Sequence, residues 1–172
     1  MAEELQKTKI TQDFLYEYLL AHDVIVNRLQ ELMGVSIGIV MGCFHHDLNR
    51  YGKPLVFSAA NVERLNQALP QLAAHVRSCL VSFGSAQVRT GYRGVKYDPA
   101  AIEGMKQLAR YFKINAFCKR VLGWSTSKKN GVLCYAESTI YGNVSSTDVA
   151  RVNAELLAVA SMLSGIEVEP TE

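Results

Sequence analysis

The sequence predicts an α+β fold: a single domain whose antiparallel sheet is built from hairpins, with N-terminal, central and C-terminal helices flanking it. Stretches with apolar residues every three or four positions predict the helices, and short β-branched or aromatic runs bounded by turn residues predict the strands. The predicted strands follow one another along the chain, which favours local pairing. The 172 residues are enough for one core, and no linker or internal repeat is visible, so one domain over residues 1–172 is expected.

The first helix is predicted over residues 12–33. Thr11 would cap its start and Gly34 would end it. Its apolar stripe consists of Phe14, Tyr18, Ala21, Ile25, Leu29 and Leu32. Residues 35–44 are apolar and β-branched but contain glycines, which favours a strand or a broken helix. The polar stretch 45–54 is predicted to be a loop.

A second helix follows, with either Ser58 or Asn61 as its cap. Its apolar positions are Val62, Leu65, Leu69, Leu72, Val76 and Leu80. Pro70 predicts either a kink or the start of a new helix. Residues 80–83 and 86–90 then suit a hairpin around Gly84-Ser85.

Asp98-Pro99 is typical of a helix start, and this third helix is expected to end near Asn115. Residues 117–124 and 132–141 are predicted to be strands, joined by a hairpin connector over 125–131. Ser145-Ser-Thr-Asp148 resembles a capping box and opens a last helix, which Gly165 ends before a short edge strand at 166–169.

Positive charge is concentrated in residues 89–129, which carry ten Lys and Arg against two acids in a chain of net charge +2. The flanking segments 1–35 and 130–172 are acidic. Tyrosines and other aromatics lie among the cations, and nucleic acids bind dispersed positive charge together with flat surfaces on which bases stack.

These residues predict a binding protein without catalysis, whose partner is RNA or single-stranded DNA. The predicted contacts are Arg89, Tyr92, Arg93, Lys96, Tyr97, Lys106, Arg110, Lys113, Lys119, Arg120, Lys128 and Lys129. Lys106, Arg110 and Lys113 are expected to share one helix face. The alternative is a solvated surface whose cations pair with the acidic ends of the chain.

A protein partner is the second hypothesis. The expected order strand, hairpin, strand and capped helix from Asn115 to Gly165 resembles the C-terminal half of type III secretion chaperones. The similarity lies in Lys129-Asn-Gly-Val-Leu and in Ser145-Ser-Thr-Asp148. This resemblance implies an adaptor or chaperone that forms a homodimer.

The four cysteines, Cys43, Cys79, Cys118 and Cys134, are widely spaced in apolar surroundings and are expected to be reduced, buried thiols. Cys43-Phe-His45-His46-Asp47 contains metal-ligating residue types, but it lacks a second ligand pair at a known spacing. We therefore expect no metal or other cofactor. The longest uncharged apolar run is too short for a membrane span. The acidic, polar N-terminus does not resemble a secretory signal, and together with the expected reduced thiols it favours a cytoplasmic protein.

Overall fold

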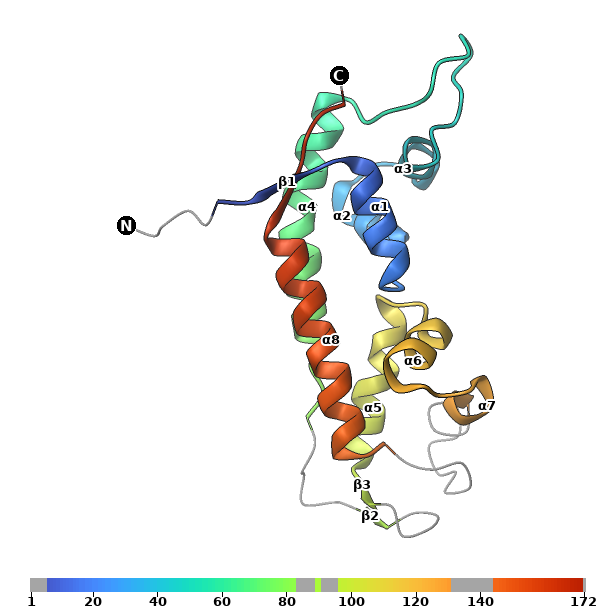
Figure 1. Cartoon of the computed structure of the whole chain (residues 1–172), viewed down its shortest axis with the longest axis vertical. Coiled ribbons are helices and arrows are strands. Elements are labelled where there is room, and N and C mark those ends of the chain that lie inside the picture. Colours follow the sequence, from blue (N-terminus) through green and yellow to red (C-terminus); the bar gives the residue numbers. More distant parts are fainter. Residues whose placement is uncertain (1–5, 83–88, 91–95, 131–143, 172) are drawn as a thin grey trace. The chain divides into compact units, whose positions relative to one another are not determined.

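The computed structural model describes residues 6–82, 89–90, 96–130 and 144–171 (Figure 1). The described chain is predominantly helical, with two short strand pairs. Its elements are β1 (Thr8–Ile10), α1 (Gln12–Ala21), α2 (Val26–Met33), α3 (Ile37–Phe44), α4 (Ala59–Ser78), β2 (Arg89–Thr90), β3 (Lys96–Tyr97), α5 (Pro99–Gln107), the 3₁₀ helix η2 (Leu108–Arg110), α6 (Ile114–Leu122), α7 (Thr126–Lys129), α8 (Ser146–Ser164) and β4 (Ile166–Val168). The predicted α+β fold with an antiparallel hairpin sheet is therefore wrong.

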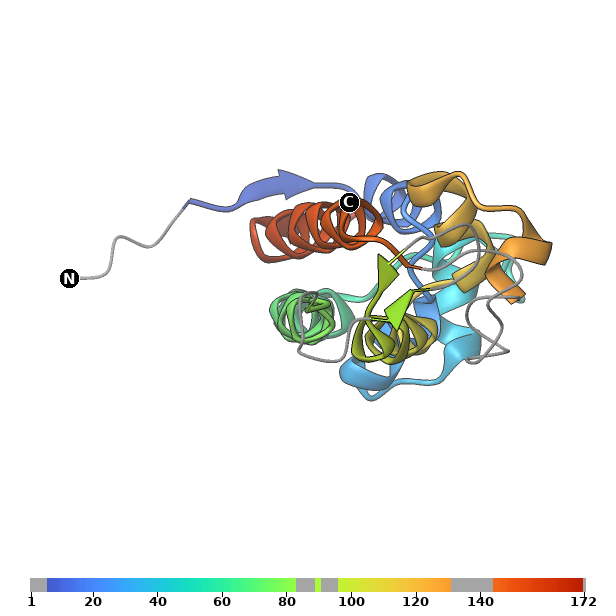
Figure 2. The same cartoon turned by 90° about the horizontal axis from the view of Figure 1, so that it is seen from below.

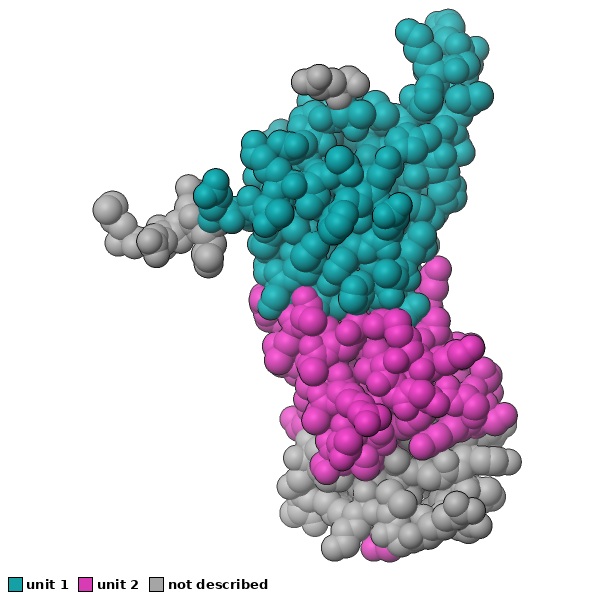
Figure 3. All heavy atoms as spheres, viewed as in Figure 1, with its two compact units in different colours: residues 1–75, 159–172 teal, residues 76–158 magenta. Residues whose placement is uncertain are grey.

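The chain forms two compact units (Figure 3). Unit 1 contains residues 1–75 and 159–172, and unit 2 contains residues 76–158. Unit 1 thus combines the N-terminal part of the chain with a short C-terminal segment, whereas unit 2 is one continuous stretch. This division leaves the single-domain hypothesis a prediction, because two compact units can still fold as one cooperative domain.

In unit 1, β1 and β4 form a parallel pair in which Lys9 is opposite Glu167. Thr11 caps α1 as predicted, since its hydroxyl accepts a hydrogen bond from the Phe14 amide. The expected single helix over 12–33 is instead two helices, because the chain turns between them at Asp23, whose φ is 59°. The break also moves the buried stripe: Leu15 and Leu19 are fully buried, whereas Phe14 is 46% exposed.

Residues 37–44 are helical rather than extended. Ser36 starts α3 with a side-chain cap on the Ile39 amide. The next helix, α4, runs through Pro70 without a break in its assignment, and the Ser58 hydroxyl caps it at the Asn61 amide. Proline removes one helical hydrogen bond at this point, and burial of the α4 apolar face offsets that loss.

In unit 2, Asp98 caps α5 as predicted, with its carboxylate accepting from the Ala100 amide. The helix stops well before Asn115 because the chain turns inward to bury Phe112, whose ring lies 4.7 Å from that of Phe117. Residues 117–124, predicted to be a strand, belong mainly to α6. Their apolar residues repeat with the helical period, so Phe117, Cys118 and Leu122 are buried on one side.

The hairpin expected near residues 80–97 is present only as a two-residue antiparallel ladder. It pairs Arg89 with Tyr97 and Thr90 with Lys96 (Figure 2). Residues 80–82 are not a strand. The proposed turn at 84–85 and the strand at 132–141 lie outside the described residues. The connector at 125–131 begins as α7, and with α6 in place of a strand the order that resembled secretion chaperones is lost.

The C-terminal helix was predicted correctly. Ser145 and Asp148 form a reciprocal capping box: the Asp148 amide donates to the Ser145 hydroxyl, and the Ser145 amide donates to the Asp148 carboxylate, both at 3.1 Å. Helix α8 then buries its apolar stripe and ends before Gly165. The predicted edge strand at 166–169 is confirmed as β4.

The structure also reveals an internal repeat, contrary to the sequence prediction. In unit 1, the Asn66 side chain accepts from the Val168 amide at 2.8 Å and donates to its carbonyl at 2.9 Å. In unit 2, Asn153 makes the same two bonds with Val81, at 2.8 and 2.7 Å. Asn153 lies 87 positions after Asn66, and Val81 lies 87 positions before Val168. We call these two pairs the asparagine clamps.

The sequence around the clamps repeats at the same spacing. Residues 58–66 are Ser-Ala-Ala-Asn-Val-Glu-Arg-Leu-Asn, and residues 145–153 are Ser-Ser-Thr-Asp-Val-Ala-Arg-Val-Asn. The first serine caps its helix in both, and the apolar positions that follow are buried in both. The two long helices α4 and α8 are therefore equivalent elements of a duplicated arrangement.

Candidate nucleic-acid interface

A short turn joins two helices in unit 2, at the end of the predicted basic stretch. Helix α6 ends at Gly123, which has a φ of 69°, a conformation that glycine adopts without strain. One residue later, the Ser125 hydroxyl accepts from the Lys128 amide and caps α7. This three-residue turn containing glycine resembles the turn of a helix-turn-helix, in which the second helix often enters the major groove of DNA. The second helix here, α7, is a single turn of four residues.

The second helix of this turn presents polar side chains to solvent. Thr126 and Ser127 are exposed, and Lys128 is half-buried with its ammonium 5.0 Å from the centre of the Trp124 ring. Trp124 is buried, so its side chain anchors the turn to the interior of the unit. Lys129, a predicted contact, is only 8% exposed and faces the core of the unit, so it is poorly placed to meet a phosphate.

The predicted row of Lys106, Arg110 and Lys113 is not one helix face. Lys106 lies on α5 and pairs with Glu103 at 3.7 Å. Arg110 lies in η2, and Lys113 precedes α6 as its N-cap residue. Arg110 and Lys113 are both exposed. The row predicted from helical spacing fails because α5 ends at Gln107.

Helix α6 carries the next two predicted contacts. Lys119 is exposed. Arg120 forms an ion pair with Glu155 of α8 at 2.8 Å, and its guanidinium lies 5.9 Å from the centre of the Phe117 ring. Glu155 belongs to the acidic C-terminal segment, so the alternative of internal neutralisation holds at this position. Lys113, just before α6, and Lys119, on α6, are both exposed to solvent.

The remaining predicted contacts lie on the β2–β3 hairpin. The backbone of Arg89, Lys96 and Tyr97 forms the ladder itself. Tyr92 and Arg93 lie outside the described residues. The structure therefore gives the backbone positions of two cationic residues of the basic stretch, Arg89 and Lys96, which belong to the same unit as α6 and α7.

Unit 1 contains a matching turn between α2 and α3. Gly34 ends α2 with a φ of 69°, and the Ser36 hydroxyl caps α3 at the Ile39 amide. Met33-Gly-Val-Ser36 lies 89 positions before Leu122-Gly-Trp-Ser125. Each turn thus has the same length, the same left-handed glycine and the same serine cap.

The second helices of the two turns differ in chemistry. Thr126, Ser127 and Lys128 of α7 correspond to Ile37, Gly38 and Ile39 of α3. Ile37 is 36% and Ile39 46% exposed, so both apolar side chains face solvent in unit 1. The next pair, Val40 and Lys129, is buried in both units. The backbone turn is repeated, whereas the exposed surface is polar in one unit and apolar in the other.

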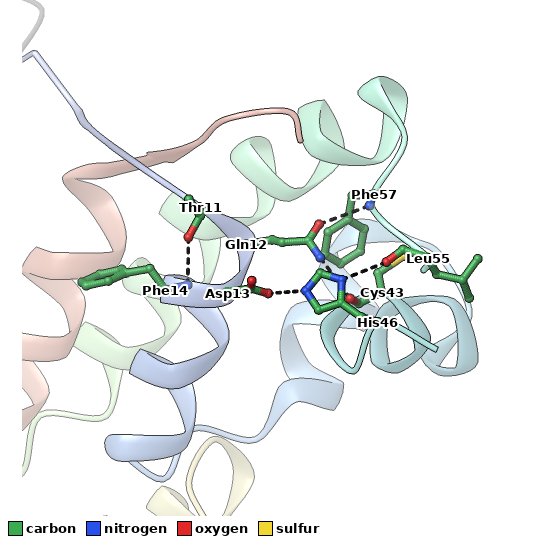
Figure 4. A network of polar contacts seen from close by, with 8 residues as sticks. All are labelled: Thr11, Gln12, Asp13, Phe14, Cys43, His46, Leu55 and Phe57. Atoms are coloured by element: carbon green, nitrogen blue, oxygen red, sulfur yellow. Dashed lines mark hydrogen bonds and ion pairs between the residues drawn. The ribbon is translucent and has the colours of Figure 1, made fainter. Parts of the chain in front are cut away.

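The His45-His46 segment connects elements of unit 1. His46 forms an ion pair with Asp13 of α1 through Nε2 at 2.7 Å, and its Nδ1 lies 3.3 Å from the Leu55 carbonyl oxygen (Figure 4). His45 Nε2 lies 2.9 Å from the Tyr16 hydroxyl. Among the residues that the structure describes, no three His, Cys, Asp or Glu side chains are grouped as metal ligands. Both ring nitrogens of His46 thus have partners that hold α1 and the 45–57 loop together.

The three described cysteines are free thiols in buried positions. Burial raises the pKa of Cys118 to about 11, against a smaller opposing effect from Lys129. Burial also raises the pKa of Cys43 and of Cys79. Since the thiolate is the reactive form, these thiols are poor nucleophiles at neutral pH. Cys134 lies outside the described residues.

Unit 1 also contains a groove of about 880 Å³ beside the start of α4 and the strand β4. Glutamine, lysine and glutamate side chains line it together with Val62, Val168 and Pro170. It has no cluster of convergent polar groups beyond the asparagine clamp. No chemistry is assigned to it.

Comparison with known proteins provides no family for this chain. No family model, curated protein or solved structure matches it. Among the described helices, none combines the length and the apolar character that a bilayer crossing requires. The functional argument therefore depends on the site itself.

Sequence reasoning located the cations of the site but missed the helix-turn-helix. The signal was present: a glycine followed two positions later by serine, each time after an apolar helical stripe, and repeated at a spacing of 89 residues. Comparing Met33–Ser36 with Leu122–Ser125 would have identified the repeat. The repeat was missed because residues 117–124 were predicted to be a strand, and a short apolar run is compatible with either a strand or a helix.

Proposed function

We propose that this protein binds double-stranded DNA through unit 2, with α7 as the recognition helix. The observation that carries this proposal is the turn at Gly123-Trp124-Ser125, which presents a polar and basic second helix. In DNA-binding helix-turn-helix proteins, the N-terminal residues of the second helix contact base edges. Thr126 and Ser127 occupy that position here, and hydroxyl groups accept or donate to bases in the major groove.

Exposed lysines around the turn suit the phosphate backbone. Lys113 and Lys119 lie before and on α6, the helix that crosses the backbone in such complexes. Arg89 and Lys96, whose backbone belongs to the β2–β3 ladder in the same unit, are kept as contacts predicted from the sequence. Lys129 and Arg120 are left out of the proposed contacts, since the first is buried and the second is paired with Glu155.

A double helix fits this surface better than the single strands expected from the sequence. Single-strand recognition needs exposed aromatic platforms. Among the described side chains of the basic stretch, Phe112, Phe117 and Trp124 are buried, whereas the side chains of Tyr92 and Tyr97 lie outside the described part of the chain. The major groove of B-DNA admits an α-helix, whereas that of an RNA duplex is too narrow for side chains to enter. The proposed ligand is therefore duplex DNA.

Fluorescence anisotropy with a labelled DNA duplex, the same sequence as a single strand, and an RNA duplex tests this proposal. The full chain is expected to bind the DNA duplex most tightly, with an affinity that falls as salt rises. The double variant Lys113→Ala/Lys119→Ala should lower the log–log salt slope by about 2, since each phosphate contact contributes about 1. Ser127→Glu should weaken binding by at least about tenfold through repulsion from the phosphates.

The matched control is Lys7→Ala/Lys53→Ala, which removes two exposed lysines from unit 1. Its salt slope and affinity should equal those of the wild type. An unchanged salt slope in the unit 2 double variant would contradict the proposed interface. Tighter binding of the single strand or of the RNA duplex would contradict the proposed ligand.

A further inference from the structure

A short hairpin follows α3 in unit 1. The Asn49 amide donates to the Lys53 carbonyl at 2.8 Å, and the Asn49 side-chain oxygen accepts from the amides of Tyr51 and Lys53 at 2.8 and 3.1 Å. Gly52 completes the turn with a φ of 73°. We call residues 48–54 the hairpin tip, whose two ends form an antiparallel bridge. In Figure 1 it belongs to the teal loop that extends from α3 before the chain enters α4.

The base of this hairpin is held firmly within unit 1 (Figure 4). The buried Gln12 side chain donates to the Cys43 carbonyl at 2.9 Å and accepts from the Phe57 amide at 3.2 Å. Phe57 is itself buried and packs edge-on against Phe44, with ring centres 5.3 Å apart. These interactions and the two contacts of His46 hold both ends of the hairpin. The tip therefore projects from a rigid base, which lowers the entropy lost when it binds a partner.

The hairpin tip carries two unusually exposed apolar side chains. Leu48 is 68% and Tyr51 71% exposed, whereas no other large hydrophobic side chain in the described part of the chain exceeds 46%. Neither side chain contributes to the core, so the stability of the fold does not account for them. Together they form a small apolar surface on a projecting turn.

Positive charge accompanies these apolar side chains. Arg50 and Lys53 are both exposed, and residues 48–54 contain no acid. Among the residues that the structure describes, neither cation belongs to an ion pair. Asp47, the nearest acid in the sequence, lies at the base of the hairpin beside α3, where a side-chain carbon added at Gly42 would be 3.6 Å from its carboxylate. The tip is thus both apolar and cationic.

We infer that the hairpin tip binds the surface of an anionic lipid bilayer. A tyrosine suits the headgroup layer because its ring is apolar and its hydroxyl is polar, and a leucine suits the adjoining acyl region. Arg50 and Lys53 would meet the anionic headgroups, and each cation near such a surface strengthens binding by about fivefold. This site is separate from the proposed DNA contacts of α7 and does not depend on them.

The size and the chemistry of the tip favour a bilayer over other partners. A stable protein interface takes about 20 residues on each side, which is far more than the tip offers. A nucleic-acid backbone would attract the two cations but would place Leu48 against charged phosphates. A bilayer accommodates both, because its binding strength is the sum of inserted apolar area and attraction to anionic headgroups.

Flotation of the full chain with lipid vesicles tests this inference. Vesicles of phosphatidylcholine and phosphatidylglycerol in equal parts should bind the chain at least about tenfold more tightly than vesicles of phosphatidylcholine alone. Arg50→Ala/Lys53→Ala should weaken binding to the mixed vesicles at least about tenfold through the lost charge. Leu48→Asn should weaken it about tenfold through the lost apolar burial. Circular dichroism checks that both variants keep the helical fold.

Each variant has a matched control in unit 1. Lys7→Ala/Arg64→Ala removes one exposed lysine and one exposed arginine outside the tip. Leu20→Asn changes a leucine of α1 that is 44% exposed. Both controls should bind the mixed vesicles like the wild type. Equal losses in the tip variants and their controls would overturn the inference, as would a wild type that does not bind the mixed vesicles.

The same variants separate the bilayer site from the proposed DNA interface. Arg50→Ala/Lys53→Ala should bind duplex DNA like the wild type, and Lys113→Ala/Lys119→Ala should bind the mixed vesicles like the wild type. Loss of nucleic-acid binding in the tip variant would assign the tip to nucleic acid and overturn the bilayer inference. If the chain binds vesicles but no DNA, the bilayer inference stands and the DNA proposal falls. If it binds DNA but no vesicles, the reverse holds.

Discussion

The two helix-turn-helix segments of this chain share a backbone and differ in surface. Gly34 and Gly123 take the same left-handed conformation, and Ser36 and Ser125 cap the following helix through the same i to i+3 hydrogen bond. The helix that follows is apolar and exposed in unit 1 but polar and basic in unit 2. The local capping residues thus determine the turn, whereas the solvent-facing side chains that follow it differ between the two units.

The cores beneath the two turns diverge less. Leu29 and Cys118 are buried at equivalent positions, as are Met33 and Leu122. Both long helices also bury their stripes and carry an asparagine clamp. Close packing penalises changes of volume and polarity at buried positions, so most of the equivalent core residues stay apolar, with the pair Val40 and Lys129 as an exception. Exposed positions carry no such constraint, so they are where the difference in proposed function lies.

The largest expected effect concerns the asparagine clamps. Asn66→Ala and Asn153→Ala should each lower the free energy of unfolding by about 3 kcal/mol, because each leaves the amide and the carbonyl of one buried valine, Val168 or Val81, without the side-chain partner. Urea denaturation of each variant measures the loss. Asn115→Ala, at an exposed position of α6, is the control and should change stability by less than about 0.5 kcal/mol. If the two variants lose clearly different amounts of stability, the two clamps share a geometry but do not contribute equally to the free energy of unfolding.

A smaller effect is expected at the helix caps of the two turns. Ser36→Ala and Ser125→Ala should each reduce stability by about 1 kcal/mol, the usual value of an N-cap hydrogen bond. Thermal unfolding measures this loss, and threonine at either position should restore most of it. The affinity for duplex DNA should distinguish the two variants. Only Ser125→Ala should bind the duplex more weakly, since only α7 is proposed to contact DNA. Equal DNA affinities for the two alanine variants would argue against a specific role for unit 2.

The smallest effect concerns the ion pair between Arg120 and Glu155. Glu155→Gln should reduce stability by about 0.5 kcal/mol, because a partly exposed ion pair contributes little. The same change should strengthen duplex binding by about twofold, since it removes a negative charge from the proposed interface. Anisotropy at low salt measures the change. Glu63→Gln in unit 1 is the matched control, and an equal gain in that variant would mean that net charge alone sets the affinity.

Several features of the fold followed from the sequence alone. Thr11, Asp98 and the Ser145–Asp148 box were identified as helix starts, and Gly34 and Gly165 as helix ends. The apolar stripe of α8 was also predicted correctly, as was that of α4 up to Val76, whereas Leu80 lies beyond α4 and is 42% exposed. Each of these depends on residues within a few positions of one another. Capping and helical periodicity are local interactions, so the sequence determines them directly.

Tertiary structure decided the rest. Residues 37–44 and 117–124 have apolar runs compatible with a strand or a helix, and burial against neighbouring helices makes them helical. The clamps join residues 102 and 72 positions apart, and the same kind of long-range packing buries Lys129 while leaving Lys119 exposed. Interactions between distant residues depend on how the whole chain folds. They determine which side chains of the basic stretch can meet a partner, and no local pattern contains that information.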